Sequence, residues 1–444
     1  MGTIGSHGTY IKVEKTALVT LWAIMKIQRF RGVPGYIKRG RETMSSESVL
    51  GKDRIVTLDV IRGFAILGIF LVNMPSFTGS EFMVYTGVDK TIRMLFDMFI
   101  QTKFYTIFSF LFGLGFYIFM TRAEARGEKV FRLFSKRLLA LLLFGILHLV
   151  FLWEGDILHS YALIGFFLLL FYHRKAKTVL IWGLILIFLF QFITGASALL
   201  AYIGEQFDES LNISGQLQME RMEEGEKKIE AYTSLSYPEL LKWRVPNELK
   251  EIIMNEPFVI PDILGMFLLG LYAGKINLFR RVAELKRRLR IIQLITLLLS
   301  IPPLAAIVFS YSKLEEVVFM HSLGNYFYLH FSGFTLSIFY IVTIALLLEK
   351  QIWQRLLNPF RYVGQMALTN YLFQTFFGVI VFYGFGLFGQ ISLSMGLLYS
   401  LIFYCVQLIF SHLWLKKFRF GPFEWLWRVM TYGKAQQFKR DVSN

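Results

Sequence analysis

The stretch Leu138–His173, LLALLLFGILHLVFLWEGDILHSYALIGFFLLLFYH, contains two apolar runs separated by the polar turn 153–156. Each run approaches the roughly 20 apolar residues that a helix needs to cross a bilayer. The stretch therefore predicts two transmembrane helices joined by a short turn at a membrane surface. Ionisable groups are costly at this depth, so those near the turn are candidates for a functional site.

The composition of the whole chain is that of a polytopic membrane protein. Hydrophobic residues make up 55% of the 444 residues, charged residues make up 18%, and the mean hydropathy is +0.51. A soluble domain cannot bury so much apolar surface, whereas a bilayer accepts it. The net charge of +16 does not indicate nucleic-acid binding, because the basic residues cluster in short loops between apolar runs, where they also face anionic lipids. The single cysteine, Cys405, excludes disulfides and cysteine metal sites.

Ten segments approach or exceed spanning length, so we expect an all-α polytopic membrane protein of about ten transmembrane helices. The fourth is the shortest. The expected spans are 57–76, 97–120, 135–153, 156–173, 178–202, 257–275, 289–310, 328–348, 365–386 and 393–415.

The order of these segments suggests five parts. They are an extension over 1–50 that is unstructured or lies on the membrane surface, a five-helix bundle over 51–202, an acidic insert over 203–256, a second five-helix bundle over 257–420, and a tail over 421–444. The insert is interpreted as a solvated connector or as a lid over an outer cavity.

Every second loop is basic, which is typical of cytoplasmic loops. Both termini, including the tail, are therefore expected in the cytoplasm, and the acidic insert outside. The basic loops contain Lys52 and Arg54; Arg122, Arg126, Lys129, Arg132, Lys136 and Arg137; Arg174, Lys175 and Lys177; Lys275, Arg280, Arg281, Lys286, Arg287 and Arg288; and Lys416, Lys417 and Arg419.

Two pairs of polar residues lie toward the predicted cytoplasmic side. Asp59 and Arg62 are three residues apart and so share one helix face. They are interpreted either as an ion pair with a snorkelling arginine, or as an anchor in which Arg62 holds a phosphate or carboxylate. Asn370 and Gln374 are four apart on the ninth span. They suit interhelical hydrogen bonds, with a contribution to a cofactor site as the alternative.

The outer polar residues include the candidate catalytic group. His148 lies seven residues before Gly155, roughly 10 Å along a helix, and so well inside the hydrocarbon. His and Asp are the usual acid–base pair, which makes His148 the candidate base and Asp156 its partner. A packing role for His148, and an N-cap role for Asp156 beside His159, stay open.

Five motifs together resemble the YeiB-like bacterial membrane proteins, a domain of unknown function, over about 50–435. They are Leu58-Asp59-Val-Ile-Arg62-Gly63-Phe-Ala-Ile-Leu-Gly68-Ile-Phe-Leu-Val-Asn73, Lys103-Phe-Tyr-Thr-Ile-Phe-Ser-Phe-Leu-Phe-Gly-Leu-Gly115, Phe144-Gly-Ile-Leu-His148 with Trp153-Glu-Gly-Asp156-Ile-Leu, Gly364-Gln-Met-Ala-Leu-Thr-Asn370-Tyr, and Phe420-Gly-Pro-Phe-Glu424-Trp-Leu-Trp427-Arg.

That family is distantly similar to transmembrane acyltransferases, which take acyl-CoA from the cytosol and acylate a hydroxyl or amine across the membrane. In the lysosomal glucosaminide acetyltransferase relatives a histidine near the second helix is central; here Lys103 stands in that region. The resemblance implies a multi-pass protein of a bacterial cell membrane, with His148 as base and Asp156 orienting it. Lys103 or Tyr161 would stabilise the oxyanion. Acyl-CoA would be held by Arg62.

The expected partners are membrane lipids and a small-molecule, glycan or lipid acceptor, without nucleic acid or metal; a homodimer is left open. A proton-coupled transporter is the main alternative, since intramembrane Asp, Arg and His serve it equally well. Against it, the sequence shows no inverted repeat and no pair of Gly/Pro-interrupted, broken helices. A non-catalytic partner in envelope assembly is a third hypothesis.

Overall fold

The computed structural model describes residues 55–207, 213–313 and 323–440. The extension expected over 1–50 lies outside them. Within the described ranges the regular elements are all helices, and Phe418 and Lys439 form an isolated bridge. This confirms the all-α class.

Eight helical segments of the described chain are long and apolar enough to cross a membrane. They are α3 (Val56–Thr78), α4 with α5 (Gly87–Phe99, Lys103–Ala125), α6 (Val130–Phe151), α8 (Ala176–Phe207), α10 with α11 (Tyr237–Arg244, Lys250–Lys275), α12 (Val282–Ser312), α13 (Leu323–Leu347) and α17 (Leu393–Lys417). The bent pair α15 (Asn358–Gln365) and α16 (Ala367–Gly378) makes up to nine, and α7 (Leu158–Phe171) is a shorter apolar helix. Each of the ten expected segments thus coincides with a helix, but the fourth is short and the ninth is broken.

The remaining elements are short or lie outside the apolar spans. They are η1 (Ser80–Phe82), α9 (Ile213–Ser234), the π-helical turn η2 (Val245–Leu249), η3 (Leu278–Arg280), α14 (Gln351–Leu356), the π-helical turn η4 (Val379–Tyr383) and α18 (Pro422–Tyr432).

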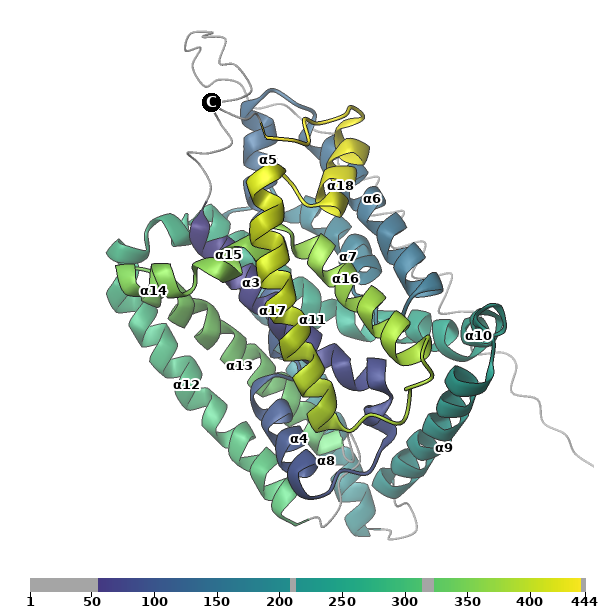
Figure 1. Cartoon of the computed structure of the whole chain (residues 1–444). Helices are drawn as coiled ribbons and strands as arrows, with labels where there is room; N and C mark the ends of the chain where they lie inside the picture. Colours follow the sequence, from purple (N-terminus) through teal and green to yellow (C-terminus); the bar gives the residue numbers. More distant parts are fainter. Residues whose placement is uncertain (1–54, 208–212, 314–322, 441–444) are drawn as a thin grey trace, which may run out of the picture. The chain divides into compact units, whose positions relative to one another are not determined.

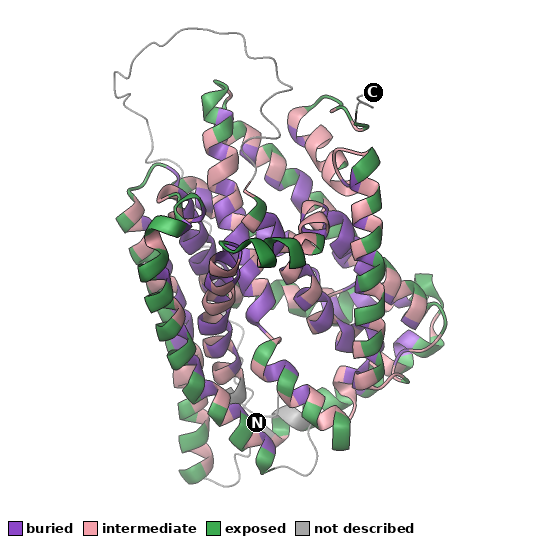
Figure 2. Cartoon of the chain, turned by 60° about the vertical axis from the view of Figure 1, so that its left-hand side comes forward, coloured by how far each residue is buried: buried purple, intermediate pink, exposed green. Residues whose placement is uncertain are grey.

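Helices from the first and second halves of the sequence pack against each other (Figure 1). The central helix α11 contacts α5, α7 and α8, and nearly all of its residues from Asp262 to Gly274 are buried. On another side, α3 packs against α15, α16 and α17. The division into segments 51–202 and 257–420 therefore describes the order of the chain, while in space their helices form one unit. Figure 2 shows the buried residues gathered on the sides of the helices that face each other.

The chain bends by 83° between α15 and α16, a single break within the ninth expected span that the sequence did not indicate. The reason lies in contacts that the local sequence does not reveal. A Cβ on Gly364 would lie 1.9 Å from the backbone oxygen of Asp59, so only glycine lets α15 lie this close to α3. At the start of α16, Glu424 of α18 accepts hydrogen bonds from the Thr369 amide (3.0 Å) and hydroxyl (2.5 Å).

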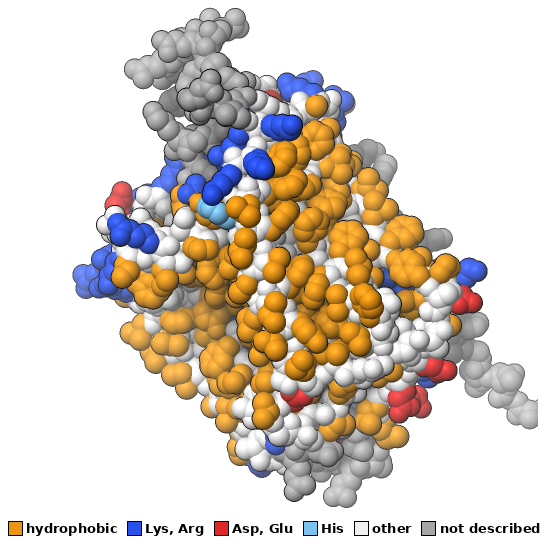
Figure 3. Space-filling view, in the orientation of Figure 1, with side chains coloured by type: hydrophobic (Ala, Val, Ile, Leu, Met, Phe, Trp, Pro, Cys, Tyr) orange, Lys and Arg blue, Asp and Glu red, His pale blue; other side chains and the backbone are white. Residues whose placement is uncertain are grey.

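Hydrophobic side chains cover a wide part of the face drawn in Figure 3. Lysine and arginine side chains gather toward one end of this face, and aspartate and glutamate toward the other. Such a surface suits lipid contact between two polar ends, as expected of a multi-pass membrane protein. Which end faces the cytoplasm stays a prediction from the basic loops.

Candidate functional site

The turn between α6 and α7 is held by a close approach of the two helices. A Cβ on Gly145 would lie 2.3 Å from the backbone nitrogen of His159, so this position requires glycine. Trp153 is buried in the turn, where its ring packs on Phe77 at a centroid distance of 4.5 Å and its Nε1 donates to Ser76 Oγ at 3.1 Å. The turn therefore sets the position of the residues that follow it.

Asp156 uses its two carboxylate oxygens for two different histidines. Oδ2 accepts the backbone N–H of His159 at 2.8 Å and lies 2.8 Å from His159 Nδ1. Oδ1 lies 2.9 Å from His148 Nδ1. Burial raises the pKa of this turn residue, but the contacts with His148 and His159 outweigh it, so the pKa lies below its ordinary value. Asp156 is thus a shared, ionised partner of both rings.

His148 is the inner member of this group. Its side chain is 1% exposed, and its Nε2 lies 2.9 Å from Thr375 Oγ1 on α16. The Tyr371 ring packs beside it at a centroid distance of 5.2 Å. The ring therefore points into the protein rather than toward lipid, with both nitrogens next to polar atoms.

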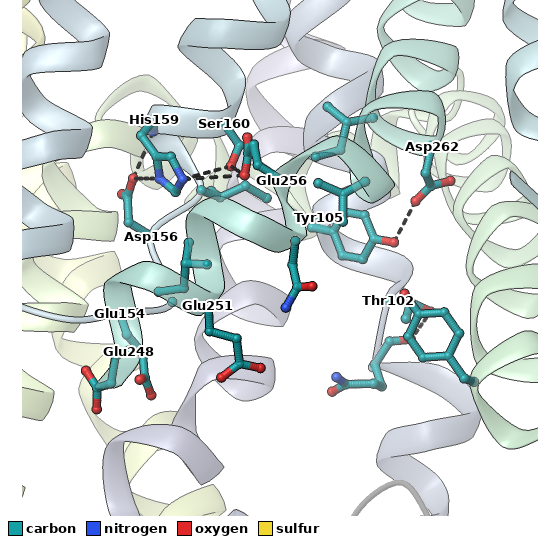
Figure 4. A pocket seen from close by; sticks show the side chains of 18 of the residues that line it. Thr102, Tyr105, Glu154, Asp156, His159, Ser160, Glu248, Glu251, Glu256 and Asp262 are labelled. Carbon is teal, nitrogen blue, oxygen red and sulfur yellow. Dashed lines mark hydrogen bonds and ion pairs between the residues drawn. The ribbon is translucent and has the colours of Figure 1, made fainter. Parts of the chain in front are cut away.

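A cavity of about 820 Å³ lies beside the turn and reaches Asp156 and His159 but not His148 (Figure 4). Its polar lining comes from α5, the α6–α7 turn, α7, α9, α10–α11 and α13. The ionisable residues in the lining are Tyr105, Glu154, Asp156, His159, Glu224, Lys227, Lys228, Glu248, Glu251, Glu256, Asp262, Tyr326 and His330.

One wall of the cavity joins His159 to two further polar groups. His159 Nε2 lies 3.5 Å from Glu256 Oε2 and 3.3 Å from Ser160 Oγ. Ser160 in turn donates to Glu256 Oε2 at 3.0 Å, and the other oxygen, Oε1 of Glu256, is buried without a hydrogen-bond partner. The imidazole edge opposite Asp156 thus faces the cavity.

A second polar group lines the cavity on α5, α11 and α13. The Tyr105 hydroxyl donates to Asp262 Oδ2 at 2.7 Å and lies 3.1 Å from His330 Nδ1. Figure 4 shows Tyr105 and Asp262 apart from the His159 group, across the view. Two acid-bearing clusters therefore share one cavity.

The described part of the acidic insert forms a further wall of the cavity. Lys228 of α9 pairs with Glu154 of the turn and, at 3.6 Å, with Glu248. Glu248 also accepts from Arg244 Nε at 2.8 Å and from the Tyr232 hydroxyl at 2.9 Å, and burial raises the pKa of Tyr232 well above its usual value. The pair with Glu154 joins α9 to the α6–α7 turn, whereas the contacts of Glu248 hold the insert together internally.

Lys103 and Tyr161 do not join this group. Lys103 is 0% exposed, and its Nζ donates to the Asp97 carbonyl (2.7 Å) and to Ser332 Oγ (2.9 Å). The Tyr161 hydroxyl donates to the Tyr105 carbonyl at 2.8 Å and lies 2.8 Å from Ser109 Oγ. Neither side chain lines the cavity. Both have structural partners where we had expected oxyanion contacts.

The residues expected to bind the acyl donor also have partners within the protein. Arg62 pairs with Asp59 at 3.1 Å. Asn370 donates to Ser411 Oγ at 3.0 Å, and Gln374 donates to Gln407 Oε1 at 2.9 Å, both on α17. The two amides thus make interhelical hydrogen bonds, the first of the two interpretations from the sequence.

Arg62 nevertheless has basic neighbours from distant parts of the chain. The charges of Arg62 and Arg428 both act on Arg137. The Arg137 guanidinium lies 3.5 Å from the centre of the Trp427 ring. Helices α3, α6 and α18 thereby bring three arginines near one another, and none of the three lines the cavity.

Glu256, Ser160 and Tyr105 were not among the residues selected from the sequence. Glu256 is one of many glutamates in the insert, and Ser160 and Tyr105 are ordinary helical residues. His159 did carry a signal, its spacing of three from Asp156, but a capping role also explained it. Among the residues that the structure describes, no group of three or more His, Cys, Asp or Glu is arranged to hold a metal ion.

Comparison with known proteins identifies one family. Residues 273–434 match the model described as "Protein of unknown function (DUF418)". The chain is 34% identical over 412 residues to "Uncharacterized protein YxaH" of Bacillus subtilis (strain 168), which covers 87% of this chain and 96% of that protein. It is 26% identical over 409 residues to "Uncharacterized protein YeiB" of Escherichia coli (strain K12), which covers 86% of this chain and 97% of that protein.

Proposed function

Because the chain belongs to the YeiB-like (DUF418) family of multi-pass membrane proteins, we propose a catalytic use for its outer cavity: acyl transfer at the bacterial plasma membrane. An acyl group passes from cytosolic acyl-CoA to a hydroxyl or amine acceptor held in the cavity. The observation that carries the proposal is the pair formed by His159 and Asp156, in which the carboxylate lies 2.8 Å from Nδ1 while Nε2 faces the cavity.

This arrangement suits general base catalysis. A carboxylate at Nδ1 orients the imidazole so that Nε2, which also lies 3.5 Å from Glu256 Oε2, faces the cavity and can exchange a proton with a bound acceptor. His159 removes the proton of the acceptor as its oxygen or nitrogen bonds to the acyl carbon. The C–S bond of the thioester then breaks, and the proton passes to the leaving thiolate.

The proposal moves the base from His148 to His159. The Nε2 of His148 lies against Thr375, and its ring does not line the cavity. His148 Nδ1 instead lies 2.9 Å from the second oxygen of Asp156. We assign it a positioning role, in which it fixes the carboxylate that orients His159.

The three arginines outside the cavity support an anionic donor. Guanidinium groups bind phosphate oxygens through paired hydrogen bonds, and CoA carries several phosphate groups. Arg62, Arg137 and Arg428 are the residues we propose for these contacts. We assign Asn370 and Gln374 to interhelical hydrogen bonds and not to donor binding.

A proton-coupled transporter remains the second candidate because of the 83° break between α15 and α16. Broken helices form the substrate and ion sites of many secondary transporters. Asp156, His148 and Thr375 also connect the cavity wall to α16 through contacts of 2.9 Å. A change of protonation at the cavity would be transmitted to the broken helix through this series of side-chain contacts.

The deciding experiment incubates the purified protein in nanodiscs with radiolabelled acetyl-CoA and a crude envelope extract. We expect label in a lipid, glycan or small molecule, with the signal lost in His159→Ala and kept in Glu230→Gln, a change on the exposed face of α9. Absence of transfer with any acyl-CoA, together with solute accumulation by proteoliposomes, would establish the transporter instead.

A further inference from the structure

The outer cavity is acidic although the chain as a whole carries a net charge of +16. Its lining includes seven carboxylates but only two lysines, besides two histidines. We propose that this cavity binds an organic cation with a primary ammonium group, so that the acceptor in the proposed transfer is an amine. The assignment of the amine as acyl acceptor rests on the proposed function, whereas the binding of the cation does not.

Five of the seven lining carboxylates form no ion pair with a lysine or arginine of the described chain, because only Glu154 and Glu248 have such a partner. Among Glu251, Glu256 and Asp262, only the last two have a histidine nearby, at 3.5 and 3.9 Å. Oε1 of Glu256 is buried without a hydrogen-bond partner. A carboxylate oxygen without a donor is costly, and a bound ammonium group would give Glu256, whose side chain is 17% exposed, a cationic partner.

Lys228 shows how the wall formed by the insert holds an ammonium group. Its Nζ pairs with Glu154 and Glu248 and lies 5.4 Å from the centre of the Phe82 ring and 5.7 Å from that of Tyr232. Carboxylates combined with aromatic faces are the surroundings that organic cations prefer. The lining of the cavity also includes the carboxylates Glu251 and Glu256 and the aromatic residues Trp243 and Tyr326.

Other ligand classes fit less well. An anion such as a phosphate or uronate would meet the excess of carboxylates, and like charges repel. A metal ion lacks a site, since no suitable group of three ligands occurs among the described residues. A neutral sugar could hydrogen-bond to the carboxylates but would leave their charge unbalanced.

An amine also fits the chemistry of the wall that carries His159. The bound ammonium first loses one proton to solvent and so becomes a nucleophile. The C–N bond then forms as the thioester C–S bond breaks, and His159 passes the second proton from nitrogen to the thiolate. The products are an amide and the free thiol.

The test measures binding without any acyl donor. Purified protein in nanodiscs is titrated by calorimetry with spermidine, glucosamine, glucose and glucuronate at constant ionic strength. We expect binding of at least one amine, and no measurable binding of glucose or glucuronate. The double variant Glu251→Gln/Glu256→Gln should bind the amine about tenfold more weakly or worse, whereas Glu230→Gln should bind like the wild type.

Binding of glucose as strong as that of glucosamine, or failure of both amines to bind the folded wild-type protein, would overturn the inference. Thermal unfolding of each variant without ligand shows whether a loss of binding reflects a loss of folding. If the amines bind but no acyl transfer occurs, the cation site stands and the acyltransferase proposal fails. Transfer to a hydroxyl compound with no amine binding gives the opposite result.

Discussion

Asp156 fixes His159 twice, because Oδ2 accepts the His159 backbone N–H and lies 2.8 Å from its Nδ1. The same oxygen therefore orients the ring and caps the first turn of α7. These two roles can be separated, because asparagine is as good an N-cap as aspartate but carries no charge.

We expect Asp156→Asn to keep the fold and to lower acyl transfer by about 10²- to 10⁴-fold, the usual contribution of general base catalysis. The measurement is turnover under saturating donor, together with the midpoint of thermal unfolding. Asp89→Asn is the matched control: Asp89 accepts the Ser394 amide outside the cavity, so its loss should leave turnover unchanged. Wild-type turnover in Asp156→Asn would remove the dyad from the mechanism.

His148 and His159 should differ in the kind of loss they cause. His159→Gln removes the base and should abolish transfer, whereas His148→Gln loosens Asp156 and should lower turnover by a smaller factor with little change in the acceptor KM. The pH dependence of turnover distinguishes the two variants. Only the loss of the base itself removes the part of the pH profile that is due to imidazole ionisation. If His148→Gln is the variant that loses this part, His148 is the base that the sequence indicated.

Gly145 should tolerate no side chain. In Gly145→Ala the new Cβ would meet the His159 backbone at 2.3 Å, so α6 and α7 must separate. Overpacking of this kind costs about 1–3 kcal/mol, which should appear as a lower unfolding midpoint and as weaker ligand binding in the cavity. Gly115→Ala is the control, because a Cβ there meets nothing within 4 Å. Equal stability of the two variants would contradict the close helix contact.

The helices and the polar turn could be read from the sequence because each depends on local composition. A run of apolar residues identifies a span wherever it packs, and the Asp156–His159 spacing identifies a shared face. The partners of these residues depend on contacts between distant segments. Thr375 lies beside His148, and Glu256 beside His159, only because α16 and α11 pack against the turn.

The break at Met366 was missed for the same reason. No proline interrupts Gly364-Gln-Met-Ala367, and the bend depends on α3 and on Glu424, both far away in the sequence. Lys103 shows the opposite case, in which a local signal has a structural explanation in distant contacts. A lysine in an apolar helix suggests a functional group, yet here Asp97 and Ser332 satisfy its donors inside the protein.

Lys103→Met should therefore act on stability rather than on the cavity. The change leaves the Asp97 carbonyl and the Ser332 hydroxyl without this donor, and we expect a loss of about 1–3 kcal/mol in unfolding free energy. Amine affinity and turnover per folded molecule should stay near wild-type values, because Lys103 does not line the cavity. A selective loss of turnover in a normally stable variant would restore Lys103 as an oxyanion group.

The orientation of the chain can be tested with single cysteines, because Cys405 is its only native one. In a Cys405→Ser background we place a cysteine at Lys177, near the start of α8, or at Glu230, beyond its end on α9; both positions are exposed. A helix of 32 residues is about 48 Å long and crosses a bilayer core of about 30 Å. The basic loop at Arg174–Lys177 predicts that a membrane-impermeant maleimide added to intact cells labels Glu230→Cys but not Lys177→Cys. The reverse result would put the cavity on the cytoplasmic side, where the acceptor and acyl-CoA would enter from the same compartment.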